Sequence, residues 1–559
     1  MKQGCQVGKK TAVCVCMLAG SLLLAACQAF NLLETNLKPS PDATPIPAAF
    51  MSIPATATPM PSSIWVSPAV PEALRQIAAS SGLALAAVPG LTTARLDVLD
   101  SQSTTSTQQS PTDNLQSTSW IYALVAPFPT VTDGVSLADI RNTWSGTPSG
   151  PFAGRPLWVD GASLDAFSRL WGDPAAGAVL VVPSDQMAVS AWAERPAWGI
   201  VPFEALEPRW KVLSVDGQSP VHNDFDPASY PLKIAFSVQP AVFNLPSTNR
   251  DPHKLTVLAM TGTTALARAT ADRMDKNGVL YPGKYVDSVL RSADIAHISN
   301  EVPFDAACPP PDPLSLSLSF CSKPGYIALL EDAGTDVVEL TGNHLMDSGA
   351  QNLLSTLDMY DRLGWKYYGG GRDLQDARQP ALLENNGNKL AFVGCDYPGP
   401  PKDWATATTP GSLPCNLDQM AEEIVRLRSQ GYLPVMTFQY QEYYQPNPTF
   451  EEEADFRRMA EDGAVIVSGS QAHEPAAMEI LNGSFIHYGL GNLFFDQMFS
   501  LPTRELFIDR HVFYNGKYID TELLTYINED YAQPRPMTAQ ERTQFLEKIF
   551  KVAGWQSEP

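Results

Sequence analysis

Acidic, amide and imidazole side chains follow several predicted strands in the second half of the chain, where they can act as acids, bases or metal ligands. Each comes shortly after a run of apolar residues with the length of a buried strand. The residues concerned are Asn300, Glu301, Asn343, His344, Glu442 and His473. Because the carboxyl ends of parallel strands meet at one edge of a sheet, we expect these groups to lie close together. Such a cluster can hold a divalent ion, or it can transfer protons without one.

Structural roles for the same residues stay open at this point. Asn343 is also suited to cap a following helix, and His344 and His473 are suited to stabilise loops by hydrogen bonding. Glu442 is also suited to pair with Arg268 or Arg372. The residues alone therefore allow two interpretations, a catalytic site and a polar ligand-binding or vestigial site.

The elements that must position these groups alternate between strands and helices, which is typical of an α/β fold. The predicted strands are residues 255–260, 293–298, 336–340, 433–437 and 464–467. Between two of them, Leu353, Leu357 and Tyr360 recur at the spacing of a helix that covers a sheet. Further on, Asn515-Gly516 predicts the turn of a hairpin, and Thr538 begins a capping box before a last helix that should dock on this part of the chain.

The composition excludes several classes of protein. The chain has 559 residues, of which 44% are hydrophobic and 18% charged, so it can form sizeable cores and is not intrinsically disordered. At about 100–200 residues per domain, this length predicts about three domains or two large ones. Lys and Arg number 38 against 60 Asp and Glu, which gives a formal charge of −22. A surface this acidic repels phosphate backbones, so we expect no nucleic-acid partner.

The first residues have the features of an export signal. Lys2, Lys9 and Lys10 precede an apolar run that ends in Leu24-Ala25-Ala26-Cys27. This arrangement resembles a bacterial lipoprotein signal, which implies that residues 1–26 are removed and that Cys27 carries the lipid. An ordinary signal peptide or a short membrane anchor is the alternative. Residues 27–63 are rich in Pro and Thr and predict an extended tether. We therefore expect an extracytoplasmic protein that is lipid-anchored to the cell membrane.

Cysteine usage agrees with an exported protein. Cys308, Cys321, Cys395 and Cys415 remain in the globular part, and four cysteines allow three pairings. The local pairing, Cys308 with Cys321 and Cys395 with Cys415, closes two short loops and is the one we favour. A metal cluster of all four thiolates is the rival, but no CxxC spacing supports it.

Residues 64–245 predict a smaller α/β domain. The runs 120–126 and 177–182 read as buried strands, Ser136 is the N-cap of a helix, and 101–119 reads as a mobile surface loop. The stretches 125–129, 135–140 and 144–146 resemble a periplasmic solute-binding protein of the phosphate- or molybdate-binding kind. A generic α/β accessory domain is the alternative, and no ligand-binding residue can be transferred.

The motifs of the second half resemble the CapA family, which is named for poly-γ-glutamate capsule synthesis. The matching residues are Asn300-Glu301, Gly342-Asn343-His344 with Asp347 and Gly349, Glu442-Tyr443, Gly469 with His473, Arg268, and the stretches 369–372, 377–378, 488–492 and 495–497. The resemblance implies a calcineurin-like αββα double-sheet sandwich at 254–530, followed by a C-terminal helix at 531–559. It also implies a polar lining for the site from Arg268, Asn300, Asp347, Arg372 and Asn492.

Departures from the family pattern concern its metal ligands. Thr263 stands where the family has a metal-binding Asp, and we place the family's next His at Phe438. Ser470 and Gln471 replace two further histidines. Because a dinuclear site needs about six or seven hard ligands, two bound ions are not expected. Glu301, Asn343 and His473 remain for one Mn, Fe or Zn ion, with no metal as an equal possibility.

Two functions follow from this sequence. The first is a membrane-anchored CapA-like lipoprotein in the synthesis, export or anchoring of an anionic polymer such as poly-γ-glutamate, with possible capsule-synthesis partner proteins. If it is an enzyme, Asn343, His344, Glu442 and His473 form the catalytic set of a metal-assisted hydrolase or transferase. The second is a non-enzymatic surface lipoprotein that binds a solute or polymer.

Overall fold

The computed structural model describes residues 62–92, 94–99 and 114–555. The predicted signal, the predicted lipidation site Cys27 and nearly all of the tether lie outside these residues. No helix within the described ranges is long and apolar enough to cross a membrane.

The first part is a mixed sheet in the order β2-β1-β3-β10-β4-β8-β6-β7, to which β9 adds beside β4 and β5 beside β9. Strand β1 pairs in parallel with both β2 and β3. Strand β4 pairs with β10 through its first half and with β8 and β9 through its second half. The strands are β1 (Ser63–Val66), β2 (Ala84–Leu85), β3 (Ala94–Val98), β4 (Gln116–Pro127), β5 (Gly134–Val135), β6 (Leu157–Val159), β7 (Val179–Val181), β8 (Trp198–Pro202), β9 (Trp210–Val215) and β10 (Lys233–Gln239).

Helices of the first part are α1 (Glu72–Ala79), α2 (Leu137–Trp144), α3 (Gly161–Trp171) and α4 (Ser184–Ala193). Ser136 caps α2 as expected, and Asp139 completes a capping box. Two expectations were wrong. Residues 116–119 belong to β4 rather than to a loop, and 177–182 is not a buried strand. Because β7 lies at the sheet edge, Leu180 and Val181 are 39% and 51% exposed.

The second part contains two larger sheets. The first has the order β14-β13-β12-β11-β24-β25-β26, with β23 added beside β11. The second has the order β16-β17-β19-β20-β22-β21. The strands are β11 (Leu255–Thr264), β12 (Ile295–Asn300), β13 (Thr335–Glu339), β14 (Lys366–Tyr368), β16 (Ala381–Asn385), β17 (Asn388–Asp396), β19 (Leu433–Gln439), β20 (Ile466–Ser470), β21 (Met478–Leu481), β22 (Ser484–His487), β23 (Asn492–Phe494), β24 (Glu505–Tyr514), β25 (Lys517–Glu529) and β26 (Gln533–Pro536).

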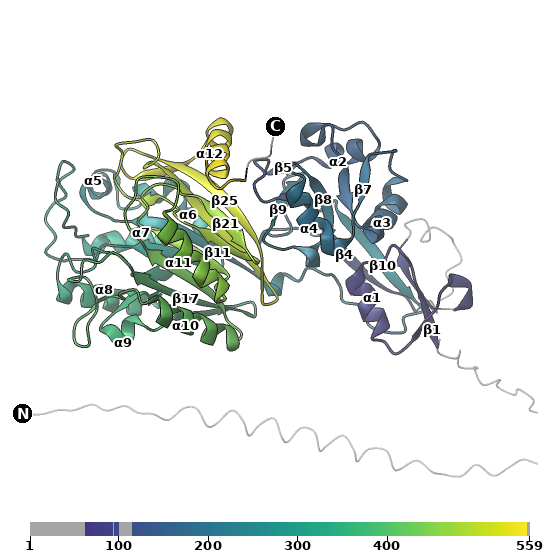
Figure 1. Ribbon diagram of the computed structural model, residues 1–559, viewed down its shortest axis with the longest axis horizontal. Helices are drawn as coiled ribbons and strands as arrows, with labels where there is room; N and C mark the ends of the chain where they lie inside the picture. The colour runs from purple at the N-terminus through teal and green to yellow at the C-terminus, as the bar shows by residue number, and fades with distance from the viewer. Residues whose placement is uncertain (1–61, 93, 100–113, 556–559) are drawn as a thin grey trace, which may run out of the picture. The chain divides into compact units, whose positions relative to one another are not determined.

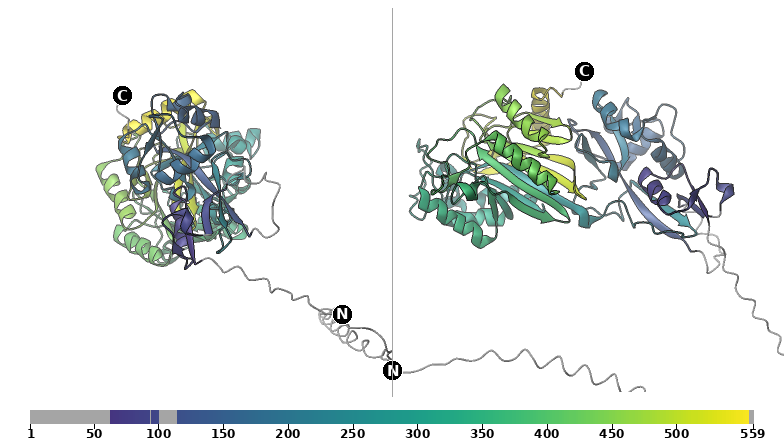
Figure 2. Two further views of the ribbon diagram at one scale, coloured as in Figure 1. Left: turned by 90° about the vertical axis from the view of Figure 1, so that its right-hand side faces the viewer. Right: turned by 60° about the horizontal axis from the view of Figure 1, so that its bottom comes forward.

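Three apolar cores separate four layers in this part. One lies between the first sheet and helices α5 (Arg268–Asn277), α6 (Asp287–Arg291), α7 (Ile327–Asp332) and α8 (Ala350–Leu363). A second joins the two sheets, for example through Leu258 of β11 and Val435 of β19. The third joins the second sheet to α10 (Leu417–Ser429) and α11 (Phe450–Glu461). The layers can be followed in Figures 1 and 2 and form the αββα sandwich that the sequence predicted.

The end of the chain adds a hairpin and a helix. Strands β24 and β25 meet at Asn515-Gly516, where both residues have positive φ, as a tight hairpin turn requires. Helix α12 (Ala539–Val552) begins after Thr538 in a capping box. Its residues Phe545 and Ile549 are buried in the core between the two sheets, so the helix docks on the second part as expected.

The cysteines form two local disulfides, Cys308–Cys321 and Cys395–Cys415. This is the pairing that the sequence favoured, and it leaves no thiolates from these residues for a metal cluster.

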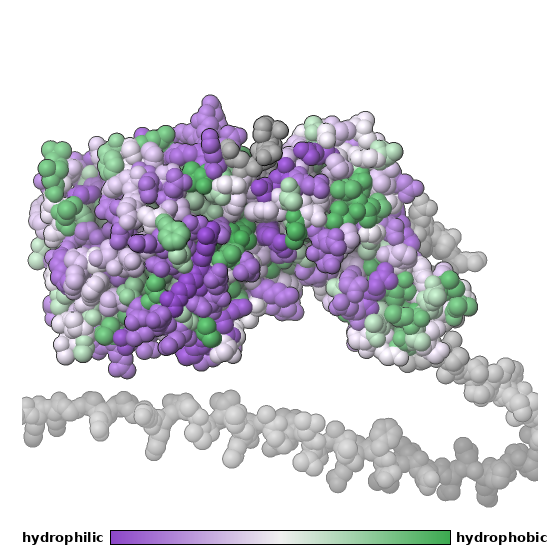
Figure 3. All heavy atoms as spheres, in the orientation of Figure 1, coloured by the Kyte–Doolittle hydropathy of each residue, from purple (hydrophilic) through white to green (hydrophobic). Residues whose placement is uncertain are grey.

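On the face shown in Figure 3, hydrophobic residues lie among hydrophilic ones in separate small areas. The first disulfide loop, however, carries three highly exposed leucines, Leu314, Leu316 and Leu318.

Candidate functional site

The candidate site lies where parallel strands of both sheets end. Glu301 follows β12, and Asn343 and His344 lie shortly after β13, in the first sheet. Gln439 and Ser470 are the last residues of β19 and β20 in the second sheet. Strands β11, β12 and β13 are parallel, as are β19 and β20. The carboxyl ends of the two sheets therefore bring their polar residues together, as parallel strands commonly do.

A glutamine joins the two sheets at this point. Gln439 Nε2 donates to Glu301 Oε1 at 2.9 Å and to Asn343 Oδ1 at 3.2 Å. Gln439 Oε1 lies 2.8 Å from Ser470 Oγ, on the side of the amide that faces away from Glu301. Gln439 is fully buried, and Glu301 is only 2% exposed. Glu301 Oε1 and Asn343 Oδ1, which are suited to bind a cation, therefore accept hydrogen bonds from the Gln439 amide instead.

Behind this contact lies a buried carboxyl group. Ser470 Oγ is 3.0 Å from Glu339 Oε1, and Thr341 donates to the same oxygen at 2.6 Å. Burial raises the pKa of Glu339, although the hydrogen bonds from Thr341 and Ser470 act in the opposite direction. The polar network thus continues from Glu301 through Gln439 and Ser470 to Glu339.

Phe438, where we placed a family histidine, does not face the site. Phe438 is fully buried, belongs to the core beneath α11, and stacks on Phe456 with ring centroids 4.7 Å apart. Successive side chains of a strand point to opposite faces, so Gln439 and not Phe438 reaches the site. Sequence reasoning missed Gln439. The available signal was a lone amide at the end of the apolar run 433–438.

The other substituted positions lie in the same region. Thr263 of β11 is fully buried, and its hydroxyl accepts from the Gln471 N–H at 3.3 Å. Three non-glycine residues around the site have left-handed backbones: Arg268, Gln471 and His473, with φ of 45°, 67° and 52°. Such conformations cost free energy and are enriched at functional sites.

His344 forms a pair with a buried aspartate. Its Nδ1 lies 2.7 Å from Asp347 Oδ2, and the Asp347 side chain is 2% exposed. Burial would lower the pKa of His344, but the hydrogen bond with Asp347 and the nearby Glu301 raise it above its usual value. Burial would raise the pKa of Asp347, but His344 and the Phe320 N–H lower it. An ion pair with a cationic imidazole is therefore favoured.

His473 is held by an amide instead. Its Nδ1 lies 2.7 Å from Asn492 Oδ1, while Asn492 donates to the His473 carbonyl at 3.1 Å. Glu442 lies at the periphery, with its carboxylate 3.9 Å from His473 Nε2 and bonded by the Tyr444 hydroxyl. The Glu442 side chain is 41% exposed, unlike Glu301. Glu442 is thus associated with His473 rather than with the buried network.

Of three further predicted lining residues, Arg268 lies beside the site and the other two are engaged elsewhere. Arg268 pairs with Asp496, and its guanidinium lies 4.7 Å from the centroid of the Phe320 ring, beside His344. Arg372 instead pairs with Asp358 and Asp361 of α8, at 2.8 and 2.6 Å. Asn300 is buried and donates to the Tyr360 hydroxyl at 2.8 Å. Asn300 and Arg372 therefore make structural contacts.

The residues present do not fit a resident metal ion. Among residues 62–92, 94–99 and 114–555, no group of three or more His, Cys, Asp or Glu side chains is placed to hold one. The amide nitrogen of Gln439 occupies the position between Glu301 and Asn343, and an N–H donor cannot serve as a cation ligand. The donor set therefore fits a hydrogen-bonded polar site.

The second part is an αββα double-sheet domain with a hydrogen-bonded polar site at the carboxyl ends of its parallel strands. Residues 257–497 match the family described as bacterial capsule synthesis protein PGA_cap. This match agrees with the resemblance of the second half to the CapA family.

Two proteins with sequences similar to this chain have names that refer to capsule or PGA biosynthesis. "Capsule biosynthesis protein CapA" of Bacillus anthracis is 25% identical over 53% of this chain and 72% of its own. "PGA biosynthesis protein CapA" of Bacillus subtilis is 25% identical over 42% of this chain and 61% of its own. Among solved structures, a 5'-nucleotidase precursor from Thermus thermophilus shows 12% identity and a TM-score of 0.31, covering 54% of this chain and 58% of that one.

Proposed function

We propose that this protein takes part in the synthesis, export or anchoring of an anionic capsule polymer such as poly-γ-glutamate, and that its site binds the polymer without a metal ion. The family of residues 257–497 supports the pathway. The single observation that carries the metal-free site is the contact of Gln439 Nε2 with both Glu301 and Asn343. His344, with its raised pKa, is the group that we assign to a polymer carboxylate.

Metal analysis combined with polymer binding tests this proposal. We expect purified protein to contain less than about one equivalent of Mn, Fe or Zn, because the bridging position is taken by an amide. Binding of poly-γ-glutamate, measured by calorimetry, should be unchanged by EDTA. His344→Gln should weaken it by roughly tenfold, the effect of losing one charge-assisted hydrogen bond.

A matched control is His253→Gln, which removes an exposed imidazole far from the site in sequence and should leave affinity unchanged. Two tightly bound ions, together with loss of binding in EDTA, would contradict the metal-free site and favour a metal-assisted enzyme. Absence of binding to the polymer by the unmodified protein would reject the assigned ligand.

We further propose that the protein is held at the outer face of the cell membrane through a lipid on Cys27. Replacing Cys27 with Ser should release the protein into the soluble fraction, because a lipidated cysteine is the anchor that the signal sequence implies. Fractionation followed by immunoblotting measures this. Cys14→Ser, within the predicted signal, is the matched control and should leave the protein in the membrane fraction. Equal membrane retention of the Cys27→Ser protein would reject the anchor.

A further inference from the structure

We propose that the disulfide Cys308–Cys321 positions the His344–Asp347 pair, so that the site is assembled only when these two cysteines are oxidised. The assignment of a polymer as the ligand of this site rests on the proposed function above. The positioning itself rests on contacts between the first disulfide loop, residues 308–321, and the segment 343–349.

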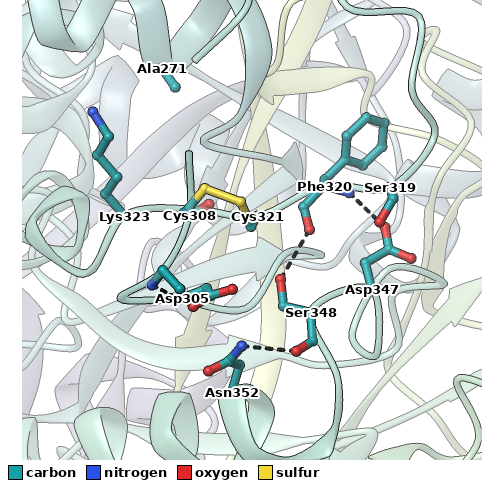
Figure 4. Close-up of a disulfide and its surroundings, with 12 residues drawn as sticks. Ala271, Asp305, Cys308, Ser319, Phe320, Cys321, Lys323, Asp347, Ser348 and Asn352 are labelled. Carbon is teal, nitrogen blue, oxygen red and sulfur yellow. Dashed lines mark hydrogen bonds between the residues drawn. A yellow bond between two sulfur atoms is a disulfide. The ribbon is translucent and has the colours of Figure 1, made fainter. Parts of the chain in front are cut away.

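The contacts are made by the residue next to Cys321. The Phe320 N–H donates to Asp347 Oδ2 at 2.9 Å, the same oxygen that bonds His344. The Phe320 ring lies 4.4 Å from the His344 ring, measured between centroids. Figure 4 shows Phe320 between the disulfide and the Asp347 carboxylate. Any displacement of Cys321 therefore moves a group that contacts both members of the pair.

The disulfide is the covalent restraint on this loop, and hydrogen bonds of Ser322 with Asp305, Pro303 and Leu266 lie beside it. The side-chain hydrogen bonds at 312–319 join residues only two apart, such as Leu314 N–H to Asp312 and Ser319 N–H to Ser317. Leu314, Leu316 and Leu318 are 85%, 95% and 77% exposed, so they add little packing. Loop closure limits the conformations of a chain. Breaking the Cys308–Cys321 bond therefore removes the covalent restraint on one side of Phe320.

The second disulfide loop, residues 395–415, contacts the other side of the same segment. Lys402 Nζ lies 3.0 Å from Asp347 Oδ1, and Asp403 Oδ1 accepts from the Met346 N–H at 3.1 Å. This loop has internal restraints of its own. The carboxylate of Asp396 accepts from the Ser412 hydroxyl at 2.9 Å and from Trp404 Nε1 at 3.1 Å. It is therefore expected to keep its conformation when Cys395–Cys415 is opened.

The chemical step is reduction by a dithiol. The reductant supplies two electrons and two protons, the S–S bond of Cys308–Cys321 breaks to give two thiols, and the dithiol becomes a disulfide. In a reducing compartment the chain would fold with Phe320 unrestrained and Asp347 without that N–H donor. The site would become competent after export, when a disulfide in the oxidising compartment takes two electrons and two protons from Cys308 and Cys321 and is itself reduced to a dithiol.

Hydrogen exchange of the full chain tests the positioning without any ligand. In the Cys308→Ser/Cys321→Ser variant, amides of 343–349 should exchange at least tenfold faster than in the oxidised protein. The Cys395→Ser/Cys415→Ser variant is the matched control and should change exchange there less than threefold. Exchange of β24 and β25 reports whether the fold is intact. Unchanged exchange in the first variant, or an equal effect of the second, would overturn the proposal.

A second set of variants decides the matter if the first variant does not fold. Phe320→Ala keeps the disulfide but removes the ring from His344, and should also accelerate exchange at 343–349. Phe320→Tyr keeps the ring and should restore slow exchange, a rescue that a general loss of stability would not show. Poly-γ-glutamate affinity should fall in the Cys308→Ser/Cys321→Ser and Phe320→Ala variants and should be retained in Phe320→Tyr. If the unmodified protein does not bind this polymer, the proposed function fails, while the exchange rates still decide the positioning.

Discussion

Gln439→Glu is expected to lower the free energy of unfolding by roughly 3–5 kcal/mol near neutral pH, because it leaves a buried carboxylate beside another without a donor. The new carboxylate would face Glu301, which is 2% exposed and now accepts from Gln439 at 2.9 Å. A divalent cation should recover much of this loss, since Glu301, Asn343 and the new carboxylate would supply oxygen ligands. Thermal unfolding with Mn²⁺ or with EDTA measures both effects.

Gln441→Glu is the matched control for this change. It adds the same charge two residues further along the chain, at an exposed position. Its effect should stay within about 0.5 kcal/mol, as for most surface substitutions, and Mn²⁺ should not stabilise it. If the unmodified protein were stabilised by Mn²⁺ as strongly as the Gln439→Glu variant, the amide would not be the group that excludes the ion.

Gly262→Ala should destabilise the protein by about 3 kcal/mol, at the upper end of the range for overpacked cores. A Cβ atom on Gly262 would lie 1.9 Å from the carbonyl oxygen of Gly491. This carbonyl also accepts from the Thr263 N–H at 3.0 Å, so β11 and the segment before β23 must separate. Asn492, which holds His473, is the next residue. Chemical denaturation measures the loss, and a weaker His473 contact should accompany it.

Gly325→Ala is the appropriate control, because nothing lies within 4 Å of the added methyl group. It should change stability by less than about 1 kcal/mol. Equal midpoints for the unmodified protein and Gly262→Ala would show that β11 can shift at this point without cost, and that the close approach of Gly491 does not position the site.

The arrangement of strands could be predicted because the apolar runs are long and end in polar residues. Runs such as 336–340 and 464–467 became β13 and β20, whose ends carry Asn343 and His473 as expected. The exposure of β7 could not be predicted in the same way. An apolar run has the same composition at a sheet edge as in the centre, and only the strand order decides which it is.

The centre of the site was harder to predict than its elements. Strand β19 is buried on both faces, so no alternation of polar and apolar residues shows which side chains face the site. The choice between Phe438 and Gln439 therefore required the structure. Phe320 and Asp347 are 27 residues apart, with α7 and β13 between them, and only the folded chain shows that they touch.

The position of β1 has a mechanical consequence for a protein held by its N-terminal end. A pull that enters the chain at Ser63 acts along β1, which pairs lengthwise in parallel with β2 and β3. In this geometry the inter-strand hydrogen bonds bear the load together, as in shear, instead of opening one after another like a zipper. If the proposed lipid anchor and the proposed polymer binding both hold, tension between them would meet the resistant direction of the sheet.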